Sequence, residues 1–238
     1  MKTMVVGASR GLGRALIEGL GKPGDTLIGV SRSQPKDLKC SPGTSLAWIE
    51  ADLAEPLAAV EQIAEQAPKK LDVLIYNIGI WEDLAFSEDY RFLNDSDASI
   101  SKLVDVNITA TLLLLKRLVP RLLASSRPQL ILTGSTSGLR QSGRPEVAFG
   151  ANKFALNGMA DALREGFRQQ SLAVTVLHLG YLNTDDALCM PLQEAAQRGG
   201  GERVPVHDVV TMVDALLRLS TASFVRELVM PAIADERF

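Results

Sequence analysis

The sequence predicts a single α/β domain of the doubly wound type, with a mostly parallel seven-stranded sheet and helices on both faces. Three observations predict this fold. Short apolar runs alternate with longer segments of helical spacing, the runs are rich in Val, Ile and Leu without polar alternation, and no linker or internal repeat divides the chain. A chain of 238 residues, 46% hydrophobic and 22% charged, suits one such domain, which we take as residues 1–238.

The apolar runs predict the strands, because a parallel strand buried on both faces has no need of polar alternation. The predicted strands are 3–7, 26–31, 45–50, 72–77, 129–134, 173–179 and 227–231. Helical spacing of apolar residues predicts the helices between them. These are 11–21, 55–67, 99–124, 147–170 and 206–219. The connection 32–44 is rich in Pro, Ser and Lys and is not predicted to be a helix.

Charge and hydropathy argue against several classes of protein. A net charge of −3 gives no electrostatic signature for nucleic acid or an anionic membrane. The apolar run near the N-terminus is too short for a signal peptide, and the run 108–115 ends at two basic residues, short of the ~20 residues of a membrane span. Cys40 and Cys189 lie far apart without a CxxC motif, so we expect free thiols and a cytoplasmic protein.

Three glycines follow the first predicted strand. Gly7, Gly11 and Gly13 have GxxxGxG spacing between that strand and the next helix. Glycines there permit a tight turn and the close approach of a pyrophosphate, which the N-terminus of the helix then attracts. We therefore predict a Rossmann-type dinucleotide site; the alternative is that these glycines serve only strand–helix packing.

The end of the second predicted strand indicates which dinucleotide binds. An NAD site usually has an acidic residue there, whereas this chain has Ser31 and Arg32. A guanidinium can bind a 2′-phosphate, and Arg10 in the glycine loop could face the same group. The expected cofactor is therefore NADP(H).

Further motifs follow in order along the chain. They are EADLAE (50–55) with Asp52, YNIG (76–79) with Asn77 and Gly79, DVNITA (105–110) with Asn107, LTGSTSG (132–138) with Ser135, and LGYLNT (179–184) with Thr184. Together with the glycine loop, these motifs resemble the short-chain dehydrogenase/reductase family over nearly the whole chain. Ile78 and Leu179 depart from that pattern, standing where the family usually has Ala and Pro.

The resemblance implies hydride transfer between a nicotinamide and the carbon of a carbonyl or secondary alcohol. It implies the cofactor-binding residues Gly7, Ser9, Arg10, Gly11, Leu12, Gly13, Ser31, Arg32, Asp52, Leu53, Asn77, Gly79, Lys153 and Thr184. The catalytic positions are Ser135, Lys153 and Asn107, with no metal. In the family the Ser binds the substrate oxygen, the Lys holds the nicotinamide ribose, and the Asn supports a water linking the Lys to solvent.

The family's YxxxK motif appears here as FGANK (149–153), so Phe149 stands where the Tyr is expected. In the family the Tyr supplies a proton, which a phenyl ring cannot do. Losing a positioned general acid typically costs ~10²–10⁴-fold in rate. Three explanations stay open: an engineered Tyr→Phe change, a natural loss, or a coincidental alignment in which Phe149 is a core residue.

Other proton donors near the site are few. Tyr76 and Tyr90 are the chain's first two tyrosines, and the third, Tyr181, lies in the loop near the expected nicotinamide. Tyr181 is the better substitute donor of these, although a tyrosine there also serves packing. His178 and His207 are predicted to be structural.

Two functions of different classes therefore remain. The first is an NADP(H)-dependent oxidoreductase with impaired proton transfer. The alternative is a non-catalytic NADP(H)-binding sensor or scaffold on the same fold. A third interpretation, a flavin or NAD enzyme on a generic Rossmann domain, requires the motifs above to be accidental.

Substrate choice in such folds falls to loops beyond the carboxyl ends of the strands, here 80–94, 138–147 and 185–203. Arg140, Gln141 and Arg144 in the second loop could meet a polar or anionic substrate, or could simply be solvated. In the third loop, a short helical stretch before three glycines (199–201) predicts a mobile lid with a hinge.

The expected partner is a small carbonyl or alcohol substrate, with no nucleic acid and no membrane. Helices 99–124 and 147–170 carry apolar residues on more than one side. The family forms dimers or tetramers through these two helices, so we expect a homodimer or homotetramer. The C-terminal MPAIADERF (230–238) lacks the family's usual DGG-type ending.

Overall fold

The structure is a computed structural model that describes residues 1–236. Seven strands form one sheet in the order β3-β2-β1-β4-β5-β6-β9, and each neighbouring pair is parallel. The strands are β1 (Lys2–Val6), β2 (Thr26–Ser31), β3 (Ser45–Glu50), β4 (Val73–Tyr76), β5 (Gln129–Thr133), β6 (Ala173–Leu179) and β9 (Glu227–Met230). The predicted doubly wound fold is therefore confirmed, and each predicted strand is present.

The strand order reverses between β1 and β4. Val6 pairs with Val30 of β2 on one side and with Tyr76 of β4 on the other. In open parallel sheets, a ligand binds in the crevice outside the carboxyl ends of the strands at such a reversal. The topology therefore points to the ends of β1 and β4 as the cofactor site.

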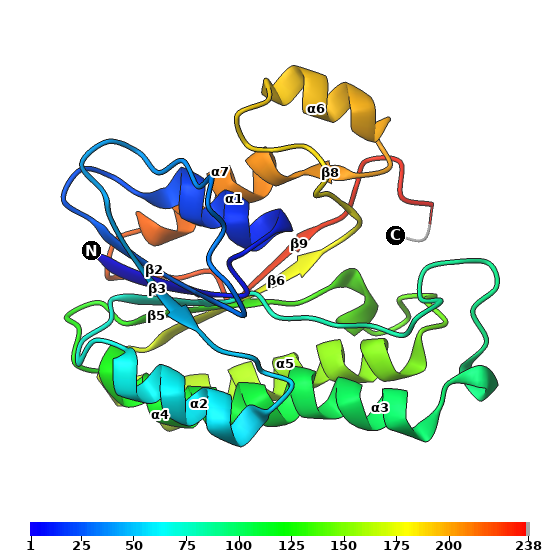
Figure 1. Ribbon diagram of the computed structural model, residues 1–238, viewed down its shortest axis with the longest axis horizontal. Helices are drawn as coiled ribbons and strands as arrows, with labels where there is room; N and C mark the ends of the chain where they lie inside the picture. The colour runs from blue at the N-terminus through cyan, green and yellow to red at the C-terminus, as the bar shows by residue number, and fades with distance from the viewer. Residues whose placement is uncertain (237–238) are drawn as a thin grey trace.

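Helices cover both faces of the sheet (Figure 1). The helices are α1 (Gly11–Leu20), α2 (Pro56–Gln66), α3 (Asp97–Val104), α4 (Ala110–Leu122), α5 (Val147–Gly166), α6 (Leu192–Gly199) and α7 (Val206–Leu217). α1 and α7 lie on one face, and α2, α4 and α5 on the other. Each face has its own core: Met4 and Val6 of β1 belong to the cluster under α4, whereas Val5 between them belongs to the cluster under α1.

The predicted helix 99–124 differs in the structure. The helical segment runs without a gap from Asp97 to Leu122. Within it, a π-helical turn at Asp105–Thr109 joins α3 to α4. The extra residue of a π turn breaks the 3.6-residue periodicity, and such turns occur frequently at functional sites. This turn carries Asn107.

By length and composition, Asp97–Leu122 could also cross a membrane, with a mean hydropathy of 1.5. In this fold one side of it covers the sheet, and Leu114, Leu118 and Leu122 are fully buried there. That is the arrangement of a core helix in a globular protein.

The three connections with unusual sequence take distinct forms. Residues 32–44 contain no helix or strand, as expected, and Arg14 of α1 holds Asp37 in that loop at 3.0 Å. The segment 185–203 contains α6, as its helical stretch predicted, followed by Gly200 and Gly201 with φ of 58° and 81°. A short parallel pair, β7 (Leu182–Asn183) with β8 (Val204–Pro205), joins the two ends of this segment.

Candidate cofactor and active site

The glycine loop is packed without room for side chains. Gly7 has a φ of 84°, and a Cβ on it would lie 2.4 Å from the Asn77 carbonyl oxygen. A Cβ on Gly13 would lie 1.9 Å from the Gly7 carbonyl oxygen. Arg10, which precedes α1, makes no side-chain cap, so the first N–H groups of the helix remain available to an anion.

Loops from distant parts of the chain meet this turn. The Asn77 side chain donates to the Gly7 carbonyl at 3.4 Å. The Thr184 methyl group lies 3.3 Å from where a Gly11 Cβ would be. Four of the predicted cofactor residues therefore come together around the N-terminus of α1: Gly7 after β1, Gly11 at the start of α1, Asn77 after β4 and Thr184 after β7.

The expected 2′-phosphate side carries unpaired positive charge. Arg10 and Arg32 are exposed, and neither side chain forms an ion pair or hydrogen bond within residues 1–236. Ser31 Oγ donates to the Ser33 carbonyl at 2.8 Å. Arg14, by contrast, forms ion pairs with Glu18 and Asp37.

The remaining predicted cofactor residues differ in exposure. Ser9 is half-buried on the loop, and Asp52 is exposed while accepting from the Ala54 N–H at 3.1 Å. Leu12 and Leu53 are buried in the core, so only their main-chain groups can reach a ligand.

Lys153 lies on α5, one turn after Phe149, and points into the sheet. Its Nζ donates to the carbonyl oxygens of Ile78 at 3.1 Å and Thr133 at 2.9 Å. A Cβ on Gly79 would lie 3.0 Å from that Nζ, so a larger residue there would crowd the amine. Burial lowers the pKa of Lys153 from 10.5 to about 8. The amine is thus held beside the cofactor crevice between the ends of β4 and β5.

Ser135 and Asn107 approach from two other elements. Ser135 follows β5, and its Oγ accepts from the Ser137 N–H at 3.1 Å, which leaves its own O–H free to donate. Asn107, on the π turn, binds both main-chain groups of Ile80, accepting from the N–H at 3.0 Å and donating to the carbonyl at 2.8 Å. Asn107 therefore fixes the start of the 80–94 loop.

Phe149 lies between the lysine and a set of aromatic rings. Its ring centroid is 5.7 Å from Lys153 Nζ. The ring stands edge-to-face with Phe86 at 5.2 Å and with Trp81 at 6.3 Å. Phe86 in turn contacts Tyr181 at 5.7 Å. We call Trp81, Phe86, Phe149 and Tyr181 the aromatic cluster.

The tyrosines are placed differently from one another. Tyr181 reaches Phe149 only through Phe86, and its hydroxyl accepts from Arg144 at 3.0 Å. Tyr76 is buried in the core under α4, and burial raises its pKa far above the usual range. Tyr90 donates to Asp95 at 3.0 Å, and burial raises its pKa to about 12.

Both histidines lie in hydrogen-bonded surroundings. His178 in β6 is fully buried, with Nδ1 3.3 Å from the Ser135 carbonyl, and burial lowers its pKa. His207 Nε2 lies 2.8 Å from the Met190 carbonyl. Within the described part of the chain, no group of three or more His, Cys, Asp or Glu side chains is arranged to hold a metal.

Three acids at the site were not found from the sequence. Glu146, which precedes α5, is buried, and its Oε1 accepts from the Phe86 N–H at 2.9 Å. Glu82 is buried, and its Oε1 accepts from the N–H groups of Ala148 and Phe149, both at 3.0 Å, at the N-terminus of α5. Asp235 in the C-terminal tail pairs with Arg144 at 2.7 Å. Each is a single acid in an irregular segment, so no spacing or motif signals it.

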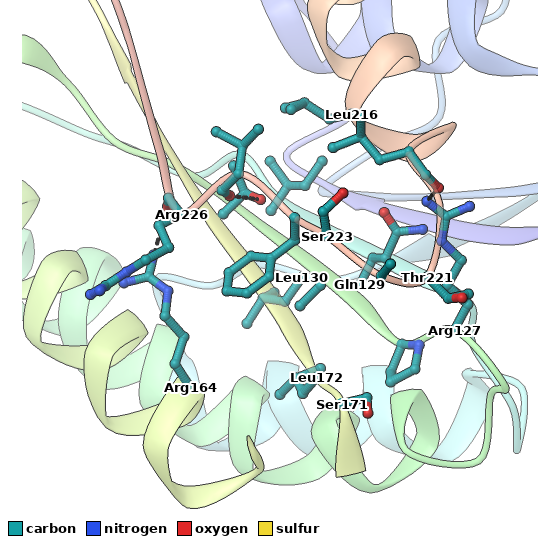
Figure 2. A pocket seen from close by; sticks show the side chains of 18 of the residues that line it. Arg127, Gln129, Leu130, Arg164, Ser171, Leu172, Leu216, Thr221, Ser223 and Arg226 are labelled. Atoms are coloured by element: carbon teal, nitrogen blue, oxygen red, sulfur yellow. Dashed lines mark hydrogen bonds between the residues drawn. The ribbon is translucent and has the colours of Figure 1, made fainter. Parts of the chain in front are cut away.

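A separate cavity of about 760 Å³ lies at the opposite, amino ends of β5 and β6 (Figure 2). Gln129 and Arg127 line one side, and Arg164 and Arg226 line the other. The latter two arginines both bind Asp161, at 2.7 and 2.8 Å. None of the predicted site residues lines this cavity.

Comparison with known proteins identifies the family of this chain. The chain belongs to the short chain dehydrogenase family, whose sequence model matches residues 2–190. Proteins of this family are oxidoreductases that use a nicotinamide cofactor.

Two curated proteins are similar to this chain in sequence. The chain is 29% identical over 190 residues to an NADPH-dependent pterin aldehyde reductase of Arabidopsis thaliana, covering 76% of this chain and 75% of that protein. It is 24% identical over 241 residues to the oxidoreductase UcpA of Escherichia coli O157:H7, covering 98% and 87%.

Solved structures share the fold. An alcohol dehydrogenase from Thermococcus sibiricus, complexed with 5-hydroxy-NADP, superimposes with a TM-score of 0.80 at 18% identity, covering 98% of this chain and 96% of that one. A metagenomic short-chain oxidoreductase in complex with NADP gives a TM-score of 0.71 at 23% identity, covering 97% and 96%.

Proposed function

We propose that this protein is an NADP(H)-dependent oxidoreductase that interconverts a carbonyl and a secondary alcohol, with proton transfer impaired because Phe149 replaces the tyrosine. The observation that carries the proposal is the buried Lys153 amine, held 5.7 Å from the Phe149 ring at the ends of β4 and β5. A buried lysine is costly, because desolvation disfavours its charge. Such a cost is typical of functional sites.

The residues present fit NADP(H). The closed glycine loop and the free N-terminus of α1 suit a pyrophosphate, and the unpaired Arg10 and Arg32 suit a 2′-phosphate. Lys153 would hold the nicotinamide ribose, and Thr184 the carboxamide. When bound, the cofactor supplies the hydride.

The protein's own groups then act on the substrate oxygen. The Ser135 Oγ accepts a hydrogen bond from the Ser137 N–H. Its own O–H is therefore available to donate a hydrogen bond to the substrate oxygen. Lys153 stands near enough to Phe149 to act on a hydroxyl at that position. The phenyl ring has no such hydroxyl, so the proton must come from elsewhere, at a cost of ~10²–10⁴-fold in rate.

The aromatic cluster supports a second candidate, a non-catalytic NADP(H)-binding sensor or scaffold. Phe149 is only 6% exposed and is enclosed by Phe86 and Trp81, as a core residue would be. The cofactor side would still bind in such a protein. The two candidates therefore differ only on the substrate side.

The proposal includes a homodimer or homotetramer in the cytoplasm. Leu112 on α4 is 50% exposed and Phe154 on α5 is 45% exposed, which is consistent with an interface on these helices. Cys40 and Cys189 are both unpaired, as expected in a reducing compartment.

Restoring the hydroxyl tests the proposed function. NADPH oxidation with aldehydes, ketones and quinones is measured for the native chain and for Phe149→Tyr, and we expect a gain of ~10²–10⁴-fold in kcat. The matched control is Phe224→Tyr, which adds a hydroxyl to an exposed ring beside the separate cavity and should leave the rate unchanged. Equal activity in the native chain and Phe149→Tyr would contradict the role given to residue 149. NADPH binding without turnover in either chain would favour the sensor.

A further inference from the structure

Arg144 is not a solvated loop arginine. Its side chain is 6% exposed, although it lies in the 138–147 loop, where Arg140 is exposed. Its Nη2 lies 2.7 Å from Asp235 Oδ2, and its Nη1 donates to the Tyr181 hydroxyl at 3.0 Å. The guanidinium also lies 4.6 Å from the Tyr181 ring centroid. Arg144 is therefore built into the wall of the aromatic cluster.

The carboxylate that Arg144 holds comes from the C-terminal tail. The Asp235 side chain is 4% exposed, while Ile233 on the same tail is 98% exposed and Glu236 is also exposed. The tail follows β9 (Figure 1), and Ala234 and Asp235 contact the 185–203 and 138–147 loops through Gly201 and Arg144. Of the side chains of Ile233, Asp235 and Glu236, only that of Asp235 is buried.

The buried Arg144 guanidinium must be paired with an anion. If the Asp235 carboxylate left and nothing replaced it, the uncompensated buried charge would destabilise the protein strongly. Residues 231–236 form no helix or strand, and Ile233 there is almost fully exposed, so little packing holds this segment in place. An incoming carboxylate can therefore replace the Asp235 carboxylate while Arg144 and Tyr181 keep their places. The substrate carboxylate would take the place of Asp235 in the ion pair, so the Arg144 charge would remain paired throughout.

We propose that Arg144 anchors a carboxylate of the substrate, and that Asp235 occupies this position until the substrate arrives. The inference rests on the proposed function, since it assigns a substrate class to the same site. Ring-to-ring steps of 5.2 Å and 5.7 Å lead from Phe149 through Phe86 to Tyr181, beside Arg144. The substrate class is thus an oxo acid with an aromatic or apolar body, whose carbonyl and carboxylate are separated by several bonds.

The same exchange would affect the lid. The Ala234 N–H, next to Asp235, donates to the carbonyl of Gly201 at 2.8 Å, in the glycine segment that follows α6. Release of Asp235 would free the tail at this hinge.

Binding of two matched probes tests the assignment. Isothermal titration calorimetry measures the affinity of 4-formylbenzoate and of its neutral methyl ester for the NADP⁺-saturated protein, in which no reduction can occur. Asp235→Asn removes the competing charge, and we expect it to tighten binding of the acid roughly tenfold, because a tethered competitor no longer lowers the competent fraction. The affinity for the ester should change less than about twofold, well below the tenfold change expected for the acid.

Glu236→Gln is the matched control, since it removes the same charge from the next, exposed residue. It should leave both affinities unchanged. Arg144→Met should abolish the preference for the acid over the ester, and Arg144→Lys, which keeps the charge, should retain part of it. Circular dichroism verifies that the Arg144 variants fold.

Three results would overturn the assignment: equal tightening of acid and ester in Asp235→Asn, equal effects of Asp235→Asn and Glu236→Gln, or no binding of the acid to Asp235→Asn at millimolar concentration. A parallel titration with NADPH separates this failure from failure of the proposed function. If NADPH does not bind, the proposed function fails, while the effect of Asp235→Asn on 4-formylbenzoate is still measured on the cofactor-free protein.

Discussion

The cofactor side and the substrate side of this site are built in different ways. Around the glycine loop, main-chain atoms approach so closely that a Cβ on Gly13 would lie 1.9 Å from a carbonyl oxygen. Around Phe149, side chains from several loops and the tail contact one another through rings and one buried ion pair. The difference teaches that the cofactor side is shaped by the close approach of main-chain atoms, whereas the substrate side depends on contacts between side chains of separate loops.

Filling the glycine loop should have the largest effect. In Gly13→Ala, the new Cβ must displace the main chain of Gly7, so we expect a loss of more than ~3 kcal/mol in stability or a loss of NADPH binding of ~100-fold. Thermal unfolding and NADPH fluorescence measure both.

Gly158→Ala is the control for that change. Gly158 lies inside α5, and a Cβ there meets nothing within 4 Å. Alanine should stabilise the helix by about 0.5–1 kcal/mol. Native-like NADPH binding in Gly13→Ala would show that the loop has more room than the geometry indicates.

The lysine where the two sides meet gives a pH-dependent prediction. Burial lowers the pKa of Lys153 to about 8 from 10.5, so between these values the unfolded chain holds a proton that the folded chain has released. Stability should therefore rise with pH across this window, by up to about 3 kcal/mol at 1.36 kcal/mol per pKa unit. Urea unfolding from pH 7 to about 10 should show this gain in the native chain but not in Lys153→Met.

The comparison with Lys153→Met is needed because other groups titrate in the same range. Burial raises the pKa of Cys40 and Tyr90, which lowers stability as pH rises in both proteins alike. The difference between the two proteins isolates the lysine. Parallel pH curves would contradict the burial argument.

Cofactor choice sharpens the comparison on the adenosine side. Arg32→Ala should weaken NADPH binding about tenfold or more while changing NADH binding little, because a charge-assisted contact to a 2′-phosphate is worth about 1.5–3 kcal/mol. Lys36→Ala, at an exposed residue of the same loop, is the control. Equal losses for both cofactors would indicate that Arg32 does not distinguish them.

The smallest expected effect concerns the support of Phe149. Glu82 accepts the N–H groups of Ala148 and Phe149 at the start of α5, so Glu82→Gln replaces a charged cap by a neutral one. We expect a loss of about 1 kcal/mol in stability. Glu88→Gln, at an exposed acid of the same loop, should have no effect in thermal unfolding. Equal stabilities for the two variants would argue against a capping role.

Much of the cofactor side could be predicted from the sequence. Gly7, Gly11 and Gly13 are required by close approach, and local spacing is enough to reveal them. The substrate side could not be predicted in the same way. Glu82 and Asp235 reach α5 and Arg144 from distant, irregular segments, and the apolar spacing of residues 99–124 predicted one helix without the π turn that carries Asn107.

The sequence by itself determined the seven strands of this protein's sheet, the glycine loop and the missing hydroxyl at position 149, because each depends on residues near one another in the chain or on a motif in fixed order. Only the tertiary structure decided that Phe149 lies in an aromatic cluster, that Tyr181 is bound by Arg144, and that the C-terminal tail supplies the carboxylate facing that arginine. The physical reason is that such contacts join loops of irregular backbone, whose positions follow from packing rather than from periodicity.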